Sequence, residues 1–368
     1  MNTVWLVLGW VFAVIFGLLT VSMLLLHNWL EALVLFLVML LCLPPVTTFL
    51  QDQFGLFIHP LLRVLLIAGL LFLFVRLLLG GEATSIYASP DVQEQFSAIY
   101  DEKMTEWPVP YEDRYLDTEY GKIHVIVSGP EDGAPLLLLH ASGVASWSWK
   151  YNIAELSQYY RAYTIDLIGD AGKSELASMD HVLQTGEDQA NLYAEIADQL
   201  GVDRAAVIGA SEGGFIGSNY AMHYPERVDK LILLGPMGYA GATRSVIRIM
   251  FAQFFPLKPI QDRTFSWAFS DATALKADYN EWFRLLMTGI RPAKVMPLPY
   301  TAEQRQRLQV PVLFVFGERD NLVGDPEAAT RLVQDVPDAR VEVVNAGHLM
   351  AGELPEQVNA LILKYLAE

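Results

Sequence analysis

Ser211 lies at the centre of Gly209–Gly213, a G-x-S-x-G pentapeptide. The apolar run Ala205–Ile208 precedes it and a helix-like stretch follows. In such a strand–turn–helix context a serine hydroxyl is held exposed on a tight, strained turn. Glycines at positions 209 and 213 let neighbouring backbone pass close to that turn. The pattern predicts a nucleophilic serine, although serine between glycines also occurs in ordinary turns.

A carboxylate and a histidine that could act with this serine follow it in the chain. Asp320 comes after the strand-like run Val310–Phe316, and His348 comes after the run Arg340–Val344. A serine hydroxyl is a poor nucleophile until a base removes its proton. We therefore assign His348 as the base and Asp320 as the acid that orients its imidazole. Asp325 is an alternative acid, less favoured because it follows a turn rather than a strand end.

The composition divides the chain of 368 residues unevenly. Residues 1–81 are almost wholly apolar and their four charges cancel, so the formal charge of −17 belongs to residues 82–368. An acidic surface repels phosphate backbones, which argues against nucleic-acid binding. The single cysteine, Cys42, forms no intrachain disulfide, and the seven histidines lack zinc-ligand spacing. We expect neither a metal nor a cofactor.

Three apolar runs in residues 1–81 predict a transmembrane region. The run Val4–Leu26 is uncharged, about long enough to cross a bilayer, and has tryptophans near its ends. It lacks the basic start and the cleavage site of a signal peptide, so we interpret it as an anchor. The run Leu30–Leu50 contains Pro44 and Pro45. It is either a kinked span or a helix that ends early and returns within the membrane.

The third run, Leu61–Leu79, has Arg63 and Arg76 near its ends, where long side chains reach the membrane interface. We predict three spans, with two as the alternative. The number of spans decides which side of the membrane the rest of the chain faces, and the positive-inside rule has only two arginines to work with. Arg76 and the absence of a signal-peptidase site favour the cytoplasmic face of a bacterial cell membrane. We make no prediction of oligomeric state.

We interpret residues 82–113 as a linker with an amphipathic lead-in helix at Val92–Met104, and residues 114–368 as one domain. Strands that are apolar throughout and separated by helices indicate a mostly parallel sheet covered on both faces. The predicted strands are Lys122–Val127, Pro135–Leu139, Ala162–Leu167, Ala205–Ile208, Lys230–Leu234, Val312–Phe316 and Val341–Val344, and the predicted helices include Glu187–Leu200 and Phe215–His223.

The alternation of strands and helices stops between Gly235 and Leu308. Stretches rich in Phe, Trp, Met and Arg, such as Ser245–Phe255 and Ala277–Met287, look helical instead. An insertion at this point would lie over the carboxyl edge of the sheet, because it follows one strand and precedes the strand that leads to the acid. We predict a helical cap at about residues 236–309. The alternative is a set of core helices with no role in substrate choice.

Four separated motifs resemble the α/β-hydrolase superfamily over essentially all of Asp113–Glu368. The nucleophile pentapeptide, the predicted acid and the predicted base occur in the family's order. The stretch Asp166–Ser174 is similar to the loop after the family's fourth strand. Its Gly172-Lys173-Ser174 does not make a phosphate loop, because Leu167 stands where a Walker A motif needs glycine.

The fourth motif is Leu136–His140 followed by Ala141-Ser142-Gly143. It is similar to the family's His-Gly-x loop, with Ala141 in place of the usual glycine. The resemblance implies that the backbone N–H groups of Ser142 and Glu212 form the oxyanion hole, which holds the negative oxygen of a tetrahedral intermediate.

The resemblance implies a serine hydrolase of the esterase or lipase-like branch. A serine nucleophile, rather than aspartate, implies an acyl-enzyme route for esters or related acyl compounds, and the anchor makes lipid-derived substrates plausible. Alternatives in the same superfamily are a C–C bond hydrolase, a cofactor-free perhydrolase or an acyltransferase. A non-enzymatic interaction module would have lost a triad residue, and none is lost. Cap arginines that could meet a carboxylated substrate are Arg244, Arg248, Arg284 and Arg291.

Residues beside these motifs also have structural interpretations. We expect His140 to have a structural role at a strand end. Trp147 and Trp149 either line the entrance of the pocket or pack in the core. Glu212 is expected to turn its carboxylate to solvent, because the mechanism uses only its backbone N–H.

Overall fold

The computed structural model describes residues 3–25, 29–54, 59–79, 85–239, 257–269, 273–291 and 293–368. The chain forms two compact units. One consists of residues 1–83 with 250–261, and the other of residues 84–249 with 262–368. Each unit has its own clusters of buried apolar side chains.

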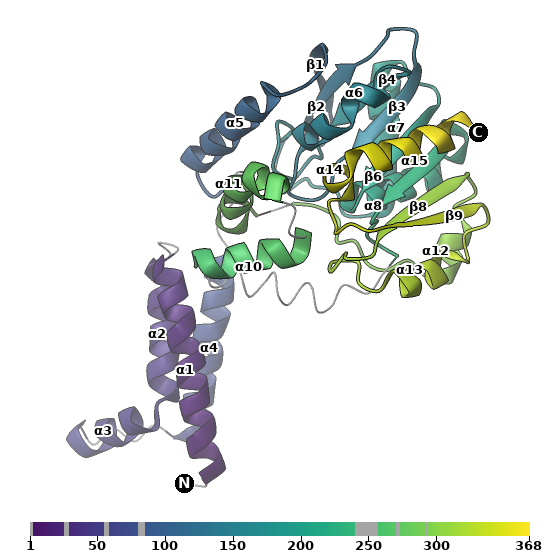
Figure 1. The fold of residues 1–368 in the computed structure, drawn as a ribbon. Helices are drawn as coiled ribbons and strands as arrows, with labels where there is room; N and C mark the ends of the chain where they lie inside the picture. Colours follow the sequence, from purple (N-terminus) through teal and green to yellow (C-terminus); the bar gives the residue numbers. More distant parts are fainter. Residues whose placement is uncertain are drawn as a thin grey trace. The chain divides into compact units, whose positions relative to one another are not determined.

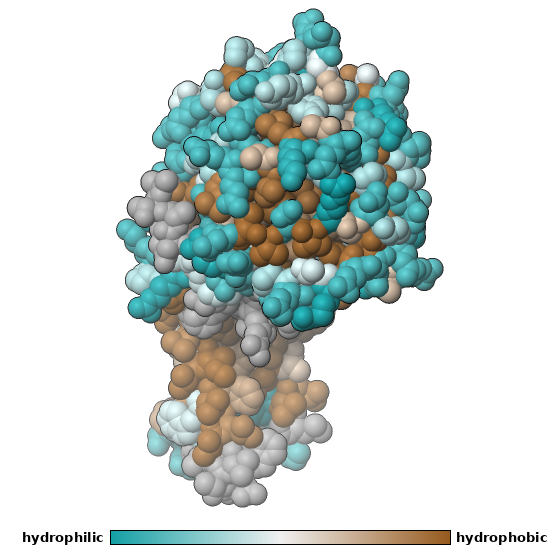
Figure 2. All heavy atoms as spheres, turned by 45° about the vertical axis from the view of Figure 1, so that its right-hand side comes forward, coloured by the Kyte–Doolittle hydropathy of each residue, from teal (hydrophilic) through white to brown (hydrophobic). Residues whose placement is uncertain are grey.

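The first unit is helical (Figure 1). Its helix α1 packs against α2, and α2 packs against α4, around small clusters of buried side chains that include Ala13, Val38 and Leu35. Many apolar side chains on the outer faces stay exposed, and Figure 2 shows hydrophobic residues covering much of these helices. The four helices before residue 80 are α1 (Thr3–Leu25), α2 (Trp29–Cys42), α3 (Pro44–Phe54) and α4 (Pro60–Leu79).

One described helix, Val7–Leu25, is long and apolar enough to cross a membrane, with a mean hydropathy of 2.4. Its length, composition and position near the N-terminus fit a membrane span and a signal sequence equally. The apolar segments Trp29–Cys42 and Leu62–Phe74 are shorter. The predicted number of spans therefore stays a prediction.

The second predicted span breaks at its proline pair. Helix α2 ends at Cys42, and α3 begins at Pro44. Proline fits the first turn of a helix but interrupts a helix interior, so the pair starts a new helix instead of continuing the old one. This is the alternative in which the second run ends early. The side chain of Arg76 lies outside the described residues.

The second unit is built on a nine-stranded sheet with the order β1-β2-β4-β3-β6-β7-β8-β9, in which β5 pairs with β2. The pairs made by β2 are antiparallel, and all the pairs from β4–β3 to β8–β9 are parallel. The strands are β1 (Tyr111–Thr118), β2 (Gly121–Ser128), β3 (Ala134–Leu139), β4 (Tyr160–Ile165), β5 (Glu175–Leu176), β6 (Ala205–Ala210), β7 (Val228–Leu234), β8 (Val312–Gly317) and β9 (Ala339–Val344).

Helices flank both faces of this sheet, which confirms the predicted fold class (Figure 1). All seven predicted strands are present. Strands β1 and β5 escaped prediction because β1 is largely exposed and polar at the edge of the sheet, and β5 has two residues. The helices around the sheet include α5 (Pro90–Met104), α6 (Ile153–Leu156), α7 (Gly186–Leu200), α8 (Glu212–His223), α13 (Pro326–Val333), α14 (Met350–Glu353) and α15 (Pro355–Ala367).

Between β7 and β8 the described elements are helical. They are α10 (Lys258–Phe269), α11 (Thr273–Gly289) and α12 (Ala302–Gln306). The predicted helix Ala277–Met287 falls within α11, whereas the predicted helix Ser245–Phe255 lies outside the described residues. The helical cap itself stays a prediction.

The predicted lead-in helix, α5, packs against α11. The ring of Phe96 on α5 meets the edge of Trp282 on α11, with ring centroids 4.8 Å apart. Backbone bonds beside this contact join Ala88 to Gly289 and Arg291 to Ile86, each at 2.8 Å. The segment from residue 85 onward therefore packs as part of the second unit.

Candidate functional site

Ser211 occupies a strained turn between β6 and α8. Its φ of 50° and ψ of −108° are unusual for a residue with a side chain, and such strain costs about 1–3 kcal/mol. A Cβ on Gly209 would lie 2.3 Å from the carbonyl oxygen of Gly213, and a Cβ on Gly213 would lie 2.2 Å from that of Leu139. Both glycines are therefore steric requirements of the turn, as the sequence interpretation proposed.

Asp320 and His348 form a buried pair at the carboxyl ends of β8 and β9. His348 Nδ1 lies 2.8 Å from Asp320 Oδ2, and both side chains are almost fully buried. The other carboxylate oxygen of Asp320 accepts the N–H groups of Leu322 and Val323, each at 2.9 Å. These bonds orient the carboxylate, and the carboxylate orients the imidazole. Asp325, the alternative acid, instead caps α13 by accepting the N–H of Glu327.

A cavity of about 30 Å³ lies beside His348. Its lining includes His348, Ala210 before the predicted nucleophile, and His140 and Ala141 before the predicted oxyanion residue. Trp149 also lines the cavity, while Trp147 packs between Tyr279 and Trp282 in the core.

None of the predicted cap arginines that the structure describes lines the cavity. Arg284 lies 3.6 Å from Asp262, and Arg291 is exposed. Arg244 and Arg248 lie outside the described residues.

Ser142 and Glu212 present the two backbone N–H groups of the predicted oxyanion hole. Ser142 follows β3. Glu212 is the first residue of α8, which follows β6, and β6 pairs with β3. Neither N–H has a hydrogen-bond acceptor among the described residues. The next amide, that of Gly143, is bound by Asp170 Oδ2 at 2.6 Å. Two amides without acceptors, one of them at a helix N-terminus, suit a developing negative charge.

The carboxylate of Glu212 is buried, so the expectation that it faces solvent is wrong. Glu212 is 2% exposed, and its Oε2 lies 2.5 Å from Nζ of Lys294. The same ammonium lies 3.3 Å from Asp170 Oδ2 and donates to the hydroxyl of Ser142. Sequence reasoning missed Lys294 because nothing in its local sequence distinguishes it from a surface lysine.

The charges in this cluster shift one another's pKa values. Burial raises the pKa of Glu212, and the cation of Lys294 offsets part of that rise. Burial alone would lower the pKa of Lys294, but Asp170 and Glu212 together raise it above its ordinary value. Burial would also raise the pKa of Asp170, yet Lys294, His140 and two backbone amides lower it overall. Lys294 is therefore a cation held between carboxylates.

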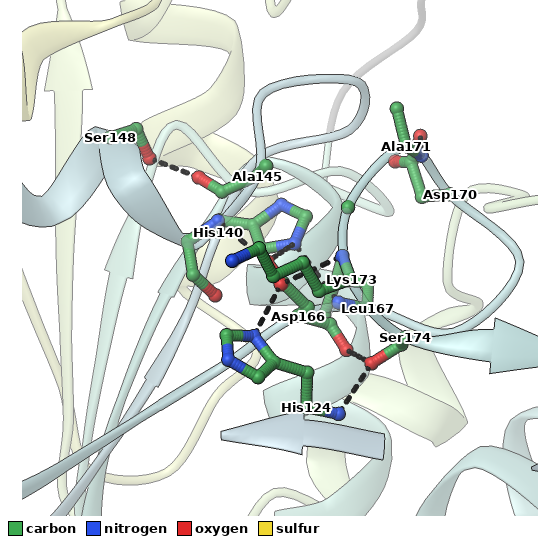
Figure 3. Close-up of polar contacts among 12 residues, drawn as sticks. His124, His140, Ala145, Ser148, Asp166, Leu167, Asp170, Ala171, Lys173 and Ser174 are labelled. Atoms are coloured by element: carbon green, nitrogen blue, oxygen red, sulfur yellow. Dashed lines mark hydrogen bonds and ion pairs between the residues drawn. The ribbon is translucent and has the colours of Figure 1, made fainter. Parts of the chain in front are cut away.

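A second buried network lies beside the site, around Asp166 at the end of β4 (Figure 3). Asp166 accepts His124 Nδ1 at 2.8 Å, the N–H of Ser146 at 2.8 Å and the N–H of Lys173 at 3.0 Å. The other ring nitrogen of His124 lies 2.8 Å from Asp113 Oδ1. This network ties β2, the loop after β3 and the loop after β4 together.

His140 has the structural role that the sequence interpretation gave it. Its Nδ1 lies 2.8 Å from the carbonyl oxygen of Ala141, and its Nε2 accepts the N–H of Leu167 at 2.9 Å (Figure 3). The ring therefore links the loop after β3 to the loop after β4. Among the described residues, no cluster of His, Cys, Asp and Glu side chains has the arrangement of a metal site.

Comparison with known proteins adds the following findings. The model of the "Alpha/beta hydrolase family" matches residues 136–361. The "uncharacterized carboxylesterase nap" of Bacillus subtilis is 31% identical over 297 residues, which is 78% of this chain and 97% of that protein. The crystal structure of naproxen esterase (carboxylesterase NP) from Bacillus subtilis has a TM-score of 0.70 at 30% identity, covering 76% of this chain and 99% of that chain.

A more distant relative has a different named activity. A 1-acylglycerol-3-phosphate O-acyltransferase of Homo sapiens is 25% identical over 266 residues, which is 61% of this chain and 75% of that protein. About a fifth of this chain lies outside its match to the Bacillus carboxylesterase, although that relative is matched over nearly its whole length.

Proposed function

Because this chain belongs to the alpha/beta hydrolase family, we propose that it is a membrane-anchored carboxylesterase in which Ser211 is the nucleophile, His348 the base and Asp320 the acid. The chain is an ester-cleaving serine hydrolase. The observation that supports the role of these residues is the buried His348–Asp320 pair, whose imidazole lines a cavity that Ala210, next to Ser211, also lines. The three residues come from distant parts of the sequence and follow the carboxyl ends of β6, β8 and β9.

The reaction proceeds through an acyl-enzyme. Ser211 Oγ attacks the ester carbonyl carbon while His348 takes the hydroxyl proton, and the carbonyl oxygen becomes an oxyanion. The backbone N–H groups of Ser142 and Glu212 bind that oxyanion. Collapse of the tetrahedral intermediate breaks the bond to the alcohol, which leaves with the proton from His348. Water then repeats the sequence on the acyl-enzyme and releases the carboxylic acid and the free serine.

Two alternatives within the family are distinguished by experiment. A C–C bond hydrolase for a carboxylated substrate needs positive charge at its cavity, and Arg284 and Arg291, the two such arginines that the structure describes, do not line the cavity described above. Acyl transfer to an acceptor other than water uses the same acyl-enzyme, so measuring the products distinguishes it from hydrolysis.

Membrane anchoring by residues 1–81 is part of the proposal. Helix α1 leaves Val7, Phe12, Val14 and Leu18 about half exposed, and so much outward apolar surface suits a lipid environment. The acidic second unit offers no general electrostatic attraction to anionic lipid. We propose that the helices hold the enzyme in a bacterial cell membrane with the catalytic unit on the cytoplasmic side. Lipid-derived esters are then accessible substrates.

The test is hydrolysis of p-nitrophenyl esters from acetate to palmitate by the detergent-solubilised full chain. The wild type should cleave at least one ester, and Ser211→Ala should lower kcat by a factor of about 10⁴ or more. Ser178→Ala, at a partly exposed turn outside the site, serves as the matched control and should keep full activity. Undiminished cleavage by Ser211→Ala would overturn the proposed nucleophile.

Anchoring has its own test. After cell lysis, the full chain should stay in the membrane pellet through a wash at high pH and be released only by detergent. Recovery of the intact chain in the aqueous fraction would contradict the anchor, and a shortened N-terminus would indicate a cleaved signal sequence instead.

A further inference from the structure

Lys294 touches the side chains of both residues that supply the proposed oxyanion hole. Its ammonium donates to the hydroxyl of Ser142, on the loop after β3, and lies 2.5 Å from the carboxylate of Glu212, at the start of α8. We infer that Lys294 is a positioning residue that clamps these two segments together, so that both backbone N–H groups face one oxyanion. This inference rests on the proposed function.

Asp170 extends the clamp to the backbone itself. Its Oδ2 accepts the N–H of Gly143 at 2.6 Å and lies 3.3 Å from Lys294 Nζ. The ammonium is therefore connected to the amide that immediately follows the predicted Ser142 donor. The backbone next to Lys294 is also bound to the loop after β4, because the N–H of Ala293 donates to the carbonyl oxygen of Gly169 at 2.9 Å.

The charge balance explains why a cation is needed at this position. Glu212 and Asp170 are both buried, with exposed fractions of 2% and 1%. Two buried carboxylates that share one ammonium repel each other strongly once the ammonium is removed, because little water screens them. The repulsion would push the start of α8 away from the loop after β3. Those are the two segments whose amides must converge on the oxyanion.

Losing one oxyanion donor typically lowers kcat by about 10²–10³ with a smaller effect on ground-state binding. A misplaced donor should have a similar but smaller effect. A lysine that only stabilised the fold would lower the amount of active enzyme and leave the kcat of each folded molecule unchanged. The two roles therefore differ in kcat and in pH dependence.

The experiment compares Lys294→Met with Lys173→Met in the full chain, using the best p-nitrophenyl ester. Lys173 is a matched control, since it is a partly buried lysine whose ammonium pairs with Asp101 at 2.6 Å outside the cavity. We expect Lys294→Met to lower kcat per folded molecule by about 10–100-fold at pH 8, with KM changed less than about threefold. Lys173→Met should leave both constants close to the wild-type values.

The pH profile tests the reason for the loss. Without Lys294 the pKa of Glu212 should rise further, because the cation that offsets its burial is gone. Protonation at lower pH then removes the repulsion from Asp170, so the ratio of wild-type to variant kcat should fall as the pH is lowered. The double variant Lys294→Met/Glu212→Gln should recover most of the kcat and lose this extra pH dependence. A ratio that is constant with pH, without recovery in the double variant, would overturn the inference.

Ser142→Ala keeps the inference testable if Lys294→Met does not fold. It removes one contact of the clamp without changing any charge, and it should lower kcat about three- to tenfold at unchanged KM. An unchanged kcat would overturn the inference. The Ser211→Ala variant in the same assay separates the two proposals. If Ser211→Ala retains activity, the proposed function fails. If Ser211→Ala is inactive and Lys294→Met has the kcat of the wild type, only the proposed role of Lys294 fails.

Discussion

In the described part of the second unit, two buried Asp–His pairs have the same nitrogen–oxygen distance. Asp320 and His348 lie 2.8 Å apart through Nδ1, and so do Asp166 and His124. Both aspartates follow the carboxyl end of a parallel strand, β8 in one pair and β4 in the other. The surroundings differ. His348 lines the cavity beside Ala210, whereas His124 is completely buried and its second ring nitrogen meets Asp113.

The difference shows what a histidine needs in order to act as a base. Burial would lower the pKa of His124, but Asp166 and Asp113 on its two ring nitrogens raise it above the ordinary value. A ring with a carboxylate at each nitrogen is held as a cation and has no position left to accept a proton. We therefore expect the pair at Asp320 to serve catalysis and the pair at Asp166 to serve stability.

The largest expected effect is that of Asp320→Asn on catalysis. An amide at this position would favour the wrong tautomer of His348, and kcat should fall by about 10³–10⁴ while the circular dichroism spectrum is unchanged. Ester hydrolysis at saturating substrate measures it. A fall in kcat of less than tenfold would contradict the catalytic role of the Asp320–His348 pair. The activity of Asp325→Asn would then be measured.

Asp166→Asn should act on stability instead. Removing the charge from a buried pair typically costs about 3–5 kcal/mol, and kcat per folded molecule should stay within about tenfold of the wild type. Burial would raise the pKa of Asp166, but His124 lowers it well below the usual range. The contribution of the Asp166 charge to the free energy of unfolding is thus present above about pH 4 and is lost as the pH falls further. Denaturant unfolding between pH 3 and 8 measures this, and equal stability of variant and wild type at pH 7 would contradict it.

His124→Asn should give a loss of similar size with the opposite pH dependence. Replacing the imidazolium leaves the buried carboxylate of Asp166 without its cation, which typically costs about 3–5 kcal/mol in unfolding free energy at pH 6. Because the folded pKa of His124 is raised, its contribution is fully present below about pH 6.5 and is lost as the pH rises through the folded pKa. The difference from the wild type should therefore shrink between pH 6.5 and 9. A difference that grows over this range would contradict the assignment of His124 as a buried cation.

Asp325→Ala should have the smallest effect. It removes the cap of α13, which costs about 1 kcal/mol of stability, and it should leave kcat unchanged because the carboxylate of Asp325 binds the N–H of Glu327, whereas His348 pairs with Asp320. Thermal unfolding and the ester assay measure the two quantities. A large fall in kcat would transfer the role of the acid from Asp320 to Asp325.

Much of the fold could be predicted because its signals are local. Each parallel strand is buried on both faces, so its sequence is apolar throughout, as in Leu136–Leu139 of β3. The edge strand β1 lacks that signal because its side chains are largely exposed. Helices α1, α2 and α4 were predicted as apolar runs, whereas the proline pair predicted either a kink or an early helix end, and the structure has the helix end.

The candidate site divides in the same way. By itself, the sequence determined the strained turn at Ser211, because its two glycines and its serine are neighbours whose steric requirements are local. It also predicted that Asp320 and His348 act together, from their positions after strands. Only the tertiary structure decided that Glu212 is buried, that His124 is enclosed by two carboxylates and that Lys294 lies between Glu212 and Asp170. These facts depend on contacts between residues far apart in the chain, and a lysine has the same local sequence signal whether its ammonium meets water or a buried carboxylate.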